Sequence, residues 1–263
     1  MPDLDELLAL ATRLATDAGA LLLEGLGSAT VAATKSSPTD VVTAYDRAAE
    51  RLLADGIRAA RPGDAILGEE GTADTGTTGV RWIVDPLDGT VNYLYGQRVW
   101  GVSVAVEVEG VVEVGVVAVP GDRETYSAVR GRGATCDGRP LRVRDAAQLS
   151  VALVGTGFSY DPARRARQAA VLAEVLPVVR DVRRVGAAAV DLCWVAAGRL
   201  DAFYERGLQP WDLAAGALVA SEAGAVVSDL HGGPASTAFC LAGAPAVVDD
   251  LRILLLGAGA ATA

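Results

Sequence analysis

Acidic side chains follow two apolar segments of this chain, and their spacing suits the binding of a cation. Ile66–Glu70 and Trp82–Asp88 each begin as an apolar strand and end in carboxylates. Pro86 fixes the turn, so we expect Asp85 and Asp88 to converge instead of alternating to opposite sides of a strand. Carboxylate oxygens are the ligands that Mg²⁺ prefers. Taken alone, each segment also fits an acidic turn or a solvated strand edge.

Two further segments extend this pattern. Gly89-Thr90 begins what reads as a helical turn, and its free backbone N–H groups would suit an anion. Gln209-Pro210-Trp211-Asp212 opens an apolar helix, although Asp212 by itself equally fits an ordinary helix cap. Several acidic strand and helix ends together predict a site of oxygen ligands in which carboxylates bridge neighbouring cations. That arrangement is used for in-line displacement at phosphorus.

The other ligand-forming residue types are scarce. The single histidine, His231, lies in a predicted surface turn, and the three cysteines, Cys136, Cys193 and Cys240, have no paired spacing. These counts exclude a multi-histidine centre, a thiolate zinc site and a disulfide framework. Oxygen ligands without histidine or thiolate favour Mg²⁺, with Mn²⁺ as the other suitable ion.

Charge and composition restrict the partners of the chain. Its 263 residues carry 33 acidic and 23 basic side chains, a formal net charge of −10, and 51% of the residues are hydrophobic. Such a chain repels nucleic acid and anionic membranes, so we expect neither as a partner. It would repel a phosphate substrate too, unless bound cations reverse the local field. We see neither a spanning apolar run nor a secretory signal, which predicts a cytoplasmic protein.

The elements that must position these residues divide the chain into two halves. Residues 1–148 form a predicted α+β lobe that carries most of the metal ligands, and residues 149–263 a predicted α/β lobe that carries the substrate contacts and Asp212. In the first lobe we expect helices over Leu4–Leu26 and from Ser37–Asp40 through Val42 to Arg61, followed by an antiparallel hairpin, Val99–Glu107 with Val111–Val119.

The second lobe should alternate strands and helices. We expect its strands at Val151–Val154, Asp201–Tyr204, Ala225–Ser228 and Phe239–Ala242, its helices at Pro162–Val179, Ala187–Ala197, Trp211–Ala223 and Ala246–Leu256, and a frayed Ala-rich end.

The acidic segments also carry a family resemblance. In this order, Gly68-Glu69-Glu70, Asp85–Thr90 and Trp211–Gly216 resemble the signatures of the inositol monophosphatase family, which belongs to a superfamily of lithium-sensitive, magnesium-dependent phosphatases. The resemblance covers nearly the whole chain, with further matches at Lys35–Asp46, Val185–Ala189 and Tyr204–Gly207. It implies a layered αβαβα sandwich like that of fructose-1,6-bisphosphatase, and commonly a homodimer, for which the hairpin Val99–Val119 is our candidate interface.

The resemblance implies a set of metal ligands. One Mg²⁺ would be held by Glu69, Asp85 and the backbone carbonyl of Leu87, and a second by Asp85, Asp88 and Asp212. Glu69 would share a third, weaker ion, around which Lys35 would help to order the preceding loop.

It also implies the catalytic and substrate-binding roles. Thr90, backed by Asp46, would take the proton of a metal-activated water, and the N–H groups of Gly89 and Thr90 would hold the phosphate. Glu205 would accept hydrogen bonds from the substrate's hydroxyl groups, while the N–H groups of Ala187 and Ala188, after Gly186, would approach its oxygens. The family more often carries a hydroxyl residue in place of Ala187, which makes the substrate's identity less secure.

Three functions therefore remain open. The first is hydrolysis of inositol-1-phosphate to myo-inositol and phosphate. Glu205 would equally pair with an ammonium group, so histidinol-phosphate hydrolysis is the alternative within the superfamily. A bisphosphate is disfavoured, because Arg183-Arg184 is the only nearby basic pair. The third, from a different class, is a non-catalytic regulatory scaffold, against which the complete carboxylate set argues.

Overall fold

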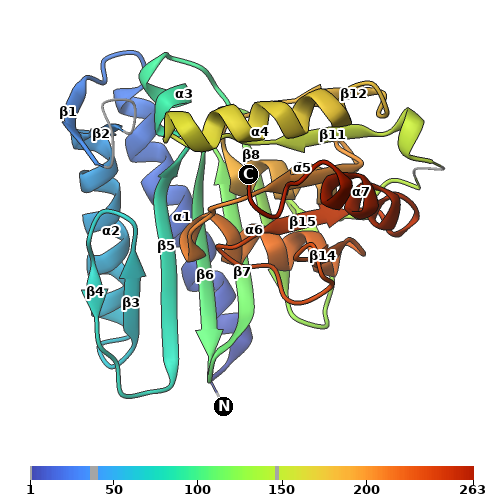
Figure 1. The fold of residues 1–263 in the computed structure, drawn as a ribbon. Coiled ribbons are helices and arrows are strands. Elements are labelled where there is room, and N and C mark those ends of the chain that lie inside the picture. The colour runs from blue at the N-terminus through green and yellow to red at the C-terminus, as the bar shows by residue number, and fades with distance from the viewer. Residues whose placement is uncertain (1, 36–40, 146–147) are drawn as a thin grey trace.

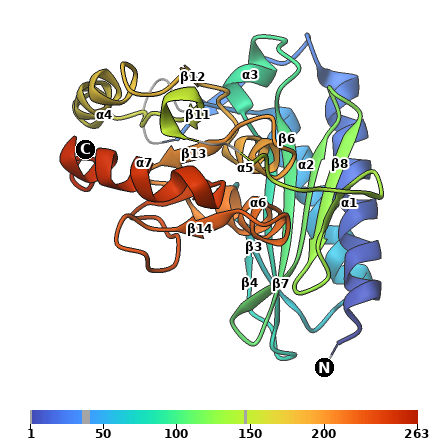
Figure 2. The same cartoon turned by 90° about the vertical axis from the view of Figure 1, so that its right-hand side faces the viewer.

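The computed structural model describes residues 2–35, 41–145 and 148–263, and its elements form five layers in the order helix, sheet, helix, sheet, helix (Figure 1). The predicted αβαβα sandwich is confirmed. Seen from the side, α1 and α2 cover the outer face of the larger sheet, whereas α4 and α7 lie beyond the smaller one (Figure 2).

The first layer consists of α1 (Leu4–Gly25) and α2 (Ala44–Ala60). Asp3 caps α1 by accepting a hydrogen bond from the N–H of Asp5, and Thr43 caps α2 in a capping box with Asp46. Both helices bury one apolar face against the larger sheet and against each other. The two-stranded ribbon β1 (Val31–Thr34) and β2 (Val41–Thr43) leads into α2.

The start predicted for the second helix is wrong in part. Ser37–Asp40 lie outside the described residues, but Val42 belongs to strand β2, and the helix begins only at Ala44 because Thr43 adopts an extended backbone and caps it.

The larger sheet has eight strands in the order β10-β9-β8-β7-β6-β5-β3-β4. Its middle is the predicted hairpin, which turns at Glu109-Gly110, two residues with positive φ. The strands are β3 (Ala65–Gly68), β4 (Ala73–Asp74), β5 (Val80–Asp88), β6 (Gly101–Val108), β7 (Val111–Val119), β8 (Glu124–Val129), β9 (Ala134–Cys136) and β10 (Arg139–Pro140). A short helix, α3 (Thr90–Leu94), follows β5.

The hairpin is not free to form a subunit interface. Strands β6 and β7 lie inside the sheet, with α1 packed on one face and α6 on the other, and most of their side chains are buried. That part of the prediction is wrong, because a segment that is apolar on both faces belongs to the core.

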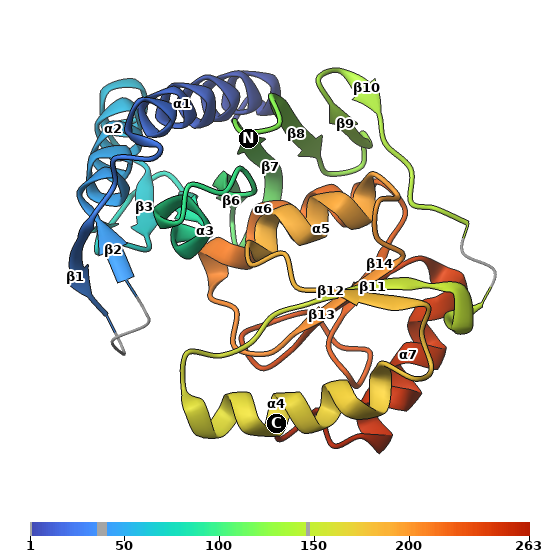
Figure 3. The same cartoon turned by 90° about the horizontal axis from the view of Figure 1, so that it is seen from above.

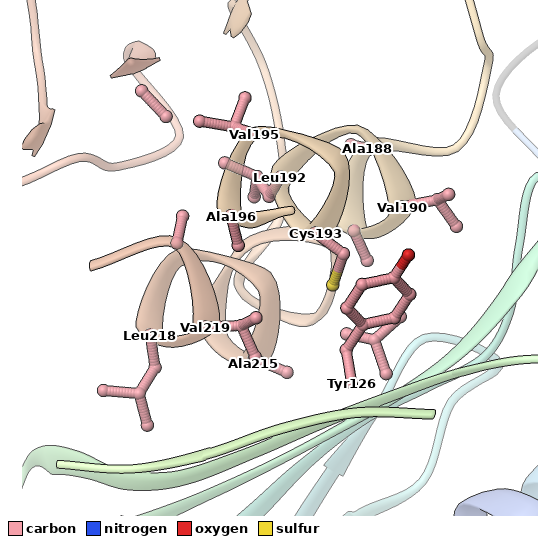
Figure 4. Close-up of a cluster of buried hydrophobic side chains, with 14 of the residues drawn as sticks. Tyr126, Ala188, Val190, Leu192, Cys193, Val195, Ala196, Ala215, Leu218 and Val219 are labelled. Atoms are coloured by element: carbon pink, nitrogen blue, oxygen red, sulfur yellow. The ribbon is translucent and has the colours of Figure 1, made fainter. Parts of the chain in front are cut away.

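The middle layer is formed by α5 (Ala188–Ala196) and α6 (Pro210–Glu222), which run between the two sheets (Figure 3). Both helices are apolar on nearly all sides, as a helix between two sheets must be. Figure 4 shows Leu192, Cys193 and Ala196 of α5 packed near Ala215 and Val219 of α6, with Tyr126 of the larger sheet against Cys193. The second half of the chain therefore shares a core with the first.

The smaller sheet has the order β12-β11-β13-β15-β14 and is covered by the outer helices α4 (Pro162–Val175) and α7 (Pro245–Gly257). Its strands are β11 (Leu153–Thr156), β12 (Asp181–Arg183), β13 (Ala202–Glu205), β14 (Val226–Ser228) and β15 (Cys240–Gly243). A single turn of 3₁₀ helix, η1 (Leu149–Val151), precedes β11, so the strand predicted at Val151–Val154 begins two residues later, at Leu153.

Two further predictions for this half are wrong. Helix α4 ends at Val175 instead of Val179, because Pro177 cannot continue it. The Ala-rich end is docked: Ala260 and Ala263 are buried, and the guanidinium group of Arg206 donates a hydrogen bond of 2.5 Å to the carbonyl of Ala263. In the described part of the chain, no helix is long and apolar enough to cross a membrane.

Candidate active site

The predicted site residues meet in one cavity of about 440 Å³ between the two sheets. Segments far apart in the sequence contribute to it: the ends of β3 and β5, the start of α3, the start of α5, the end of β13 and the start of α6. From the predicted set, it is lined by Lys35, Glu69, Asp85, Leu87, Asp88, Gly89, Thr90, Gly186, Ala187, Ala188, Glu205 and Asp212. Asp46 lies behind Thr90, outside the lining.

An irregularity in strand β5 turns two aspartates toward this cavity. Asp85 pairs with Ser103 and Asp88 with Gly101, so three residue steps on β5 face two on β6. The extra residue reverses the normal alternation, which would send the two side chains to opposite faces. The N–H of Leu87 donates to Oδ1 of Asp85 at 2.9 Å and holds that carboxylate at the bend.

Asp88 is held by the start of helix α5. The N–H groups of Ala188 and Ala189 donate to its two carboxylate oxygens at 3.2 and 2.7 Å. The sequence predicted that the N–H of Ala188 would face the substrate; the structure uses it to orient Asp88 instead, because a helix start offers free N–H groups to the nearest anion. Ala188 still lines the cavity.

Asp212 is placed by helix α6 and by the sheet together. Its Oδ2 accepts a hydrogen bond from the N–H of Gln209 at 2.7 Å. Asp212 therefore takes part in capping α6, as the third residue of a capping box that begins at Gln209. The hydroxyl of Ser103 donates to the carbonyl of Trp211 at 3.0 Å, and Ser103 is the strand partner of Asp85. This contact brings the first turn of α6 to Asp85.

Glu69 enters the cavity from the end of β3. Lys35 contacts the carboxylates of both Glu69 and Glu70, at 2.8 and 2.5 Å. Behind them, the buried carboxylate of Glu50 accepts the N–H groups of Glu70 and Thr72 at 2.6 and 2.9 Å, which fixes the turn. The two adjacent glutamates are therefore held by Lys35 and Glu50 and are not simply the solvated end of a strand.

The crowded carboxylates raise one another's pKa values. Burial, then the charges of neighbouring carboxylates, raise the pKa of Asp85 well above its ordinary value. Burial and the charge of Asp88 raise the pKa of Asp212 to about 8, and burial raises that of Asp88 itself to about 7. Asp85 is close enough to hydrogen-bond with both Glu69 and Asp212. Asp85 and Asp88 are buried and Asp212 is partly buried, and when ionised the three carboxylates destabilise one another unless positive charge joins them.

Divalent cations fit this donor set chemically. All the donors are oxygens, as hard cations require, and added positive charge would remove the repulsion that raises the pKa values. Among the described residues, however, no three acidic, histidine or cysteine side chains already stand as one set of ligands. Glu69 forms an ion pair with Lys35, and Asp88 and Asp212 accept hydrogen bonds from backbone N–H groups. These carboxylates line one cavity but do not surround a single point.

Thr90 and Asp46 form a hydrogen-bonded pair at the edge of the cavity. The hydroxyl of Thr90 lies 3.0 Å from Oδ1 of Asp46 and 3.1 Å from the carbonyl of Leu87, and it donates its hydrogen to these acceptors. Asp46 is 1% exposed, which removes the alternative of a solvated helical acid. Burial raises its pKa, although hydrogen bonds from Thr43 and Thr90 oppose the shift.

Gly89 allows the backbone to turn between β5 and α3. Its φ is +91°, and a Cβ atom there would lie 3.1 Å from the Cβ of Ala187. Asn92 of α3 donates to the carbonyls of Val99 and Val185 at 2.7 and 2.9 Å, which keeps the Gly186 segment beside this turn.

Sequence reasoning missed several residues of the cavity wall near Glu205. The wall there includes Phe158, Arg164 and Arg206, and Arg184 of the pair that it had set aside. Burial raises the pKa of Glu205 to about 8 beside them. The start signal Asp161-Pro162 marks the helix that carries Arg164, but nothing local shows that this helix end faces the cavity.

Comparison with known proteins shows which family this chain resembles in sequence and in fold. A sequence model described as the inositol monophosphatase family matches residues 3–255. The inositol-1-monophosphatase SuhB of Mycobacterium tuberculosis is 50% identical over 84% of this chain and 80% of its own length. A structure described as the Thermotoga maritima IMPase superposes with a TM-score of 0.89 at 30% identity, over 97% of this chain and 98% of that one. The Nus factor SuhB of Pseudomonas aeruginosa is 42% identical, over 86% of each chain.

Proposed function

Because the chain belongs to the inositol monophosphatase family, we propose that it hydrolyses inositol-1-phosphate to myo-inositol and phosphate. It is a phosphoric monoester hydrolase with a small phosphorylated substrate. The single observation that carries the proposal is the shared cavity in which Glu69, Asp85, Asp88 and Asp212 lie beside the Thr90 hydroxyl. The printed name of the Mycobacterium tuberculosis relative supports inositol-1-phosphate as the substrate.

The family is metal-dependent, and the proposed cofactor here is Mg²⁺, as two or three ions. Glu69, Asp85 and the carbonyl of Leu87 would hold one ion, and Asp85, Asp88 and Asp212 a second. Lys35 competes for Glu69, so a third ion would need Glu69 to leave that ion pair. When bound, Mg²⁺ supplies the positive charge that a phosphate needs and a water acidic enough to lose a proton near neutral pH.

Thr90 and Asp46 are the proposed proton acceptors. Since the Thr90 hydroxyl donates its hydrogen to Asp46, its lone pairs remain available to accept a hydrogen from the attacking water. The proton then passes through Thr90 to Asp46, whose raised pKa suits it to hold the proton.

The remaining residues orient the substrate. The backbone N–H groups of Gly89 and Thr90 would hold the phosphate oxygens, helped by the N–H of Ala187. Glu205, which also lines the cavity, would accept hydrogen bonds from ring hydroxyls. Gly186, which lines the cavity without a side chain, would contact the substrate through its backbone.

A screen of small phosphomonoesters for Mg²⁺-dependent phosphate release tests the proposal. We expect inositol-1-phosphate to be hydrolysed and Asp85→Asn to abolish turnover, with a circular dichroism spectrum like that of the parent. An Asp85→Asn protein with parental turnover would refute the ligand assignment. Inhibition by lithium is expected in the same assay, as in the lithium-sensitive superfamily.

The scaffold alternative takes some support from the relative named a Nus factor. A scaffold has no need for buried, mutually repelling carboxylates, however, and this chain keeps them at a cost in stability. Catalysis is therefore the preferred function. A homodimer is also part of the proposal, through a surface other than the buried hairpin, and a light-scattering mass of one chain would refute it.

A further inference from the structure

Two arginines that line the cavity are not engaged in ion pairs within the described part of the chain. Arg164 comes from the first turn of α4 and Arg184 from the segment after β12, and both line the cavity. Within residues 2–35, 41–145 and 148–263, neither side chain makes an ion pair. Arg206 also lines the cavity, but its guanidinium group is held by the carbonyl of Ala263. A protein with a net charge of −10 thus leaves two cations facing its substrate.

Each guanidinium group lies close to a glycine of the cavity wall, Arg184 at Gly186 and Arg164 at Gly207. Nη1 of Arg184 lies over Gly186, where a Cβ atom would be only 2.2 Å from it. Nη1 of Arg164 lies over Gly207, 2.9 Å from the position of a Cβ there, and Gly207 follows Glu205 by two residues. The charge of Arg184 also acts on the Glu205 carboxylate directly.

The cavity wall here therefore holds the guanidinium groups of Arg164 and Arg184 together with the carboxylates of Glu205 and Asp161. A hydroxyl group satisfies both kinds, because it donates to a carboxylate and accepts from a guanidinium. An ammonium group pairs with Glu205 but has no acceptor for the arginines, and two like charges repel it. A second anionic group would be accepted by the arginines.

We propose that Arg164 and Arg184 determine specificity by charge: they admit alcohol phosphates whose body is neutral or anionic and reject those that carry an ammonium group. The inference rests on the proposed phosphatase function and separates the two substrates that Glu205 alone leaves open, in favour of inositol-1-phosphate over histidinol phosphate.

The test compares kcat/KM for these two substrates in the parent protein, in Arg164→Gln, in Arg184→Gln and in the double variant. We expect each replacement to lower the ratio of inositol-1-phosphate to histidinol-phosphate hydrolysis by about tenfold, the size of one nearby like-charge interaction. High salt should reduce the effect, because the arginines are partly exposed. Arg165→Gln and Arg183→Gln are matched controls: Arg165 does not line the cavity, and Arg183 is paired with Asp181.

An unchanged ratio in the double variant, or an equal change in the two controls, would overturn the inference. A parent protein that hydrolyses neither substrate would refute the proposed function instead. In that case the same ratio is taken from dissociation constants measured by calorimetry with Mg²⁺ present, because recognition of the body does not require turnover. Equal affinities in the parent and the double variant would then overturn the inference.

Discussion

At the scale of single residues, the carboxylates that form the site lower the stability of the fold. Asp85 and Asp88 are buried and Asp212 is partly buried. Desolvation and the charges of neighbouring carboxylates raise all three pKa values, so each is harder to ionise in the folded chain than in the unfolded one. A raised carboxyl pKa means that the folded state binds more protons between the two pKa values. Stability without cations must therefore fall as pH rises through that window.

Asp212→Asn directly tests whether these carboxylates lower the stability of the fold. Between about pH 4, where an unfolded aspartate titrates, and pH 8, the chelated parent protein should lose stability steadily, and the variant should lose less. We expect the variant to melt at a higher temperature than the parent at pH 8 with chelator, and to have no turnover with Mg²⁺. A variant that melts lower at pH 8 would show that Asp212 is not repelled by its neighbours.

The Thr90–Asp46 pair allows a second test at this scale. Thr90→Val keeps the shape but removes the hydroxyl that bridges Asp46 and the Leu87 carbonyl, whereas Thr90→Ser keeps the hydroxyl. We expect Thr90→Val to lower kcat by about 10²–10⁴ and Thr90→Ser to retain most of it. A Thr90→Val variant that keeps the kcat of Thr90→Ser would show that the hydroxyl is not needed, and Thr90 would not be a proton acceptor.

At the scale of elements, the site depends on how closely helix α6 approaches the larger sheet. Gly115 of β7 leaves room for the helix backbone, since a Cβ atom there would lie 2.8 Å from the carbonyl oxygen of Ala215. The same helix carries Asp212 at its first turn and is bound to β6 through Ser103. A helix forced outward would carry Asp212 away from Asp85.

Gly115→Ala should therefore affect both stability and catalysis. Overpacking of this kind costs about 1–3 kcal/mol in the free energy of unfolding, measured by urea denaturation. We also expect weaker Mg²⁺ activation, visible as a higher Mg²⁺ concentration at half-maximal rate. Gly110→Ala is the control, because its Cβ position is open and the residue lies at the hairpin tip; its φ of +83° will cost some stability, but its Mg²⁺ dependence should be that of the parent.

At the scale of the whole molecule, the two halves are joined by a shared apolar core and by a few polar contacts. One of these is the pair between Glu124 of β8 and Arg199, which follows α5. The hydrogen bonds from Arg199 lower the pKa of Glu124, with a further contribution from the Tyr126 hydroxyl. A lowered carboxyl pKa stabilises the fold above the unfolded value, and this contribution is lost as pH falls through the folded value.

The Arg199→Gln variant should accordingly be less stable than the parent at pH 7, by up to about 1 kcal/mol, because Arg199 is partly exposed and screened. The difference should shrink once the pH falls below about 4.3, the ordinary pKa of a glutamate. Denaturant unfolding at pH 7 and pH 3.5 measures it, with Arg167→Gln on the exposed side of α4 as the control. A constant difference across this range would contradict the role of the pair.

The sequence by itself determined the long helices, the central hairpin and the acidic strand ends, because each is specified by local periodicity, turn residues and caps. It did not determine short strands such as β4, β9 and β12, which exist only because a distant partner pairs with them. Local sequence patterns also did not show that α5 and α6 lie between the two sheets, an arrangement that buries the hairpin. Nor did they show that the N–H of Ala188 donates a hydrogen bond to Asp88.

The arginines show the same division most clearly. Arg164 and Arg184 lie on separate elements with no motif between them, and only the tertiary packing around the smaller sheet brings them into the cavity that Glu205 also lines. Local patterns decide which way a chain coils or extends, since neighbouring residues set backbone dihedrals and caps. Tertiary structure decides which side chains face one another across a cavity, because that depends on contacts between segments far apart in the chain.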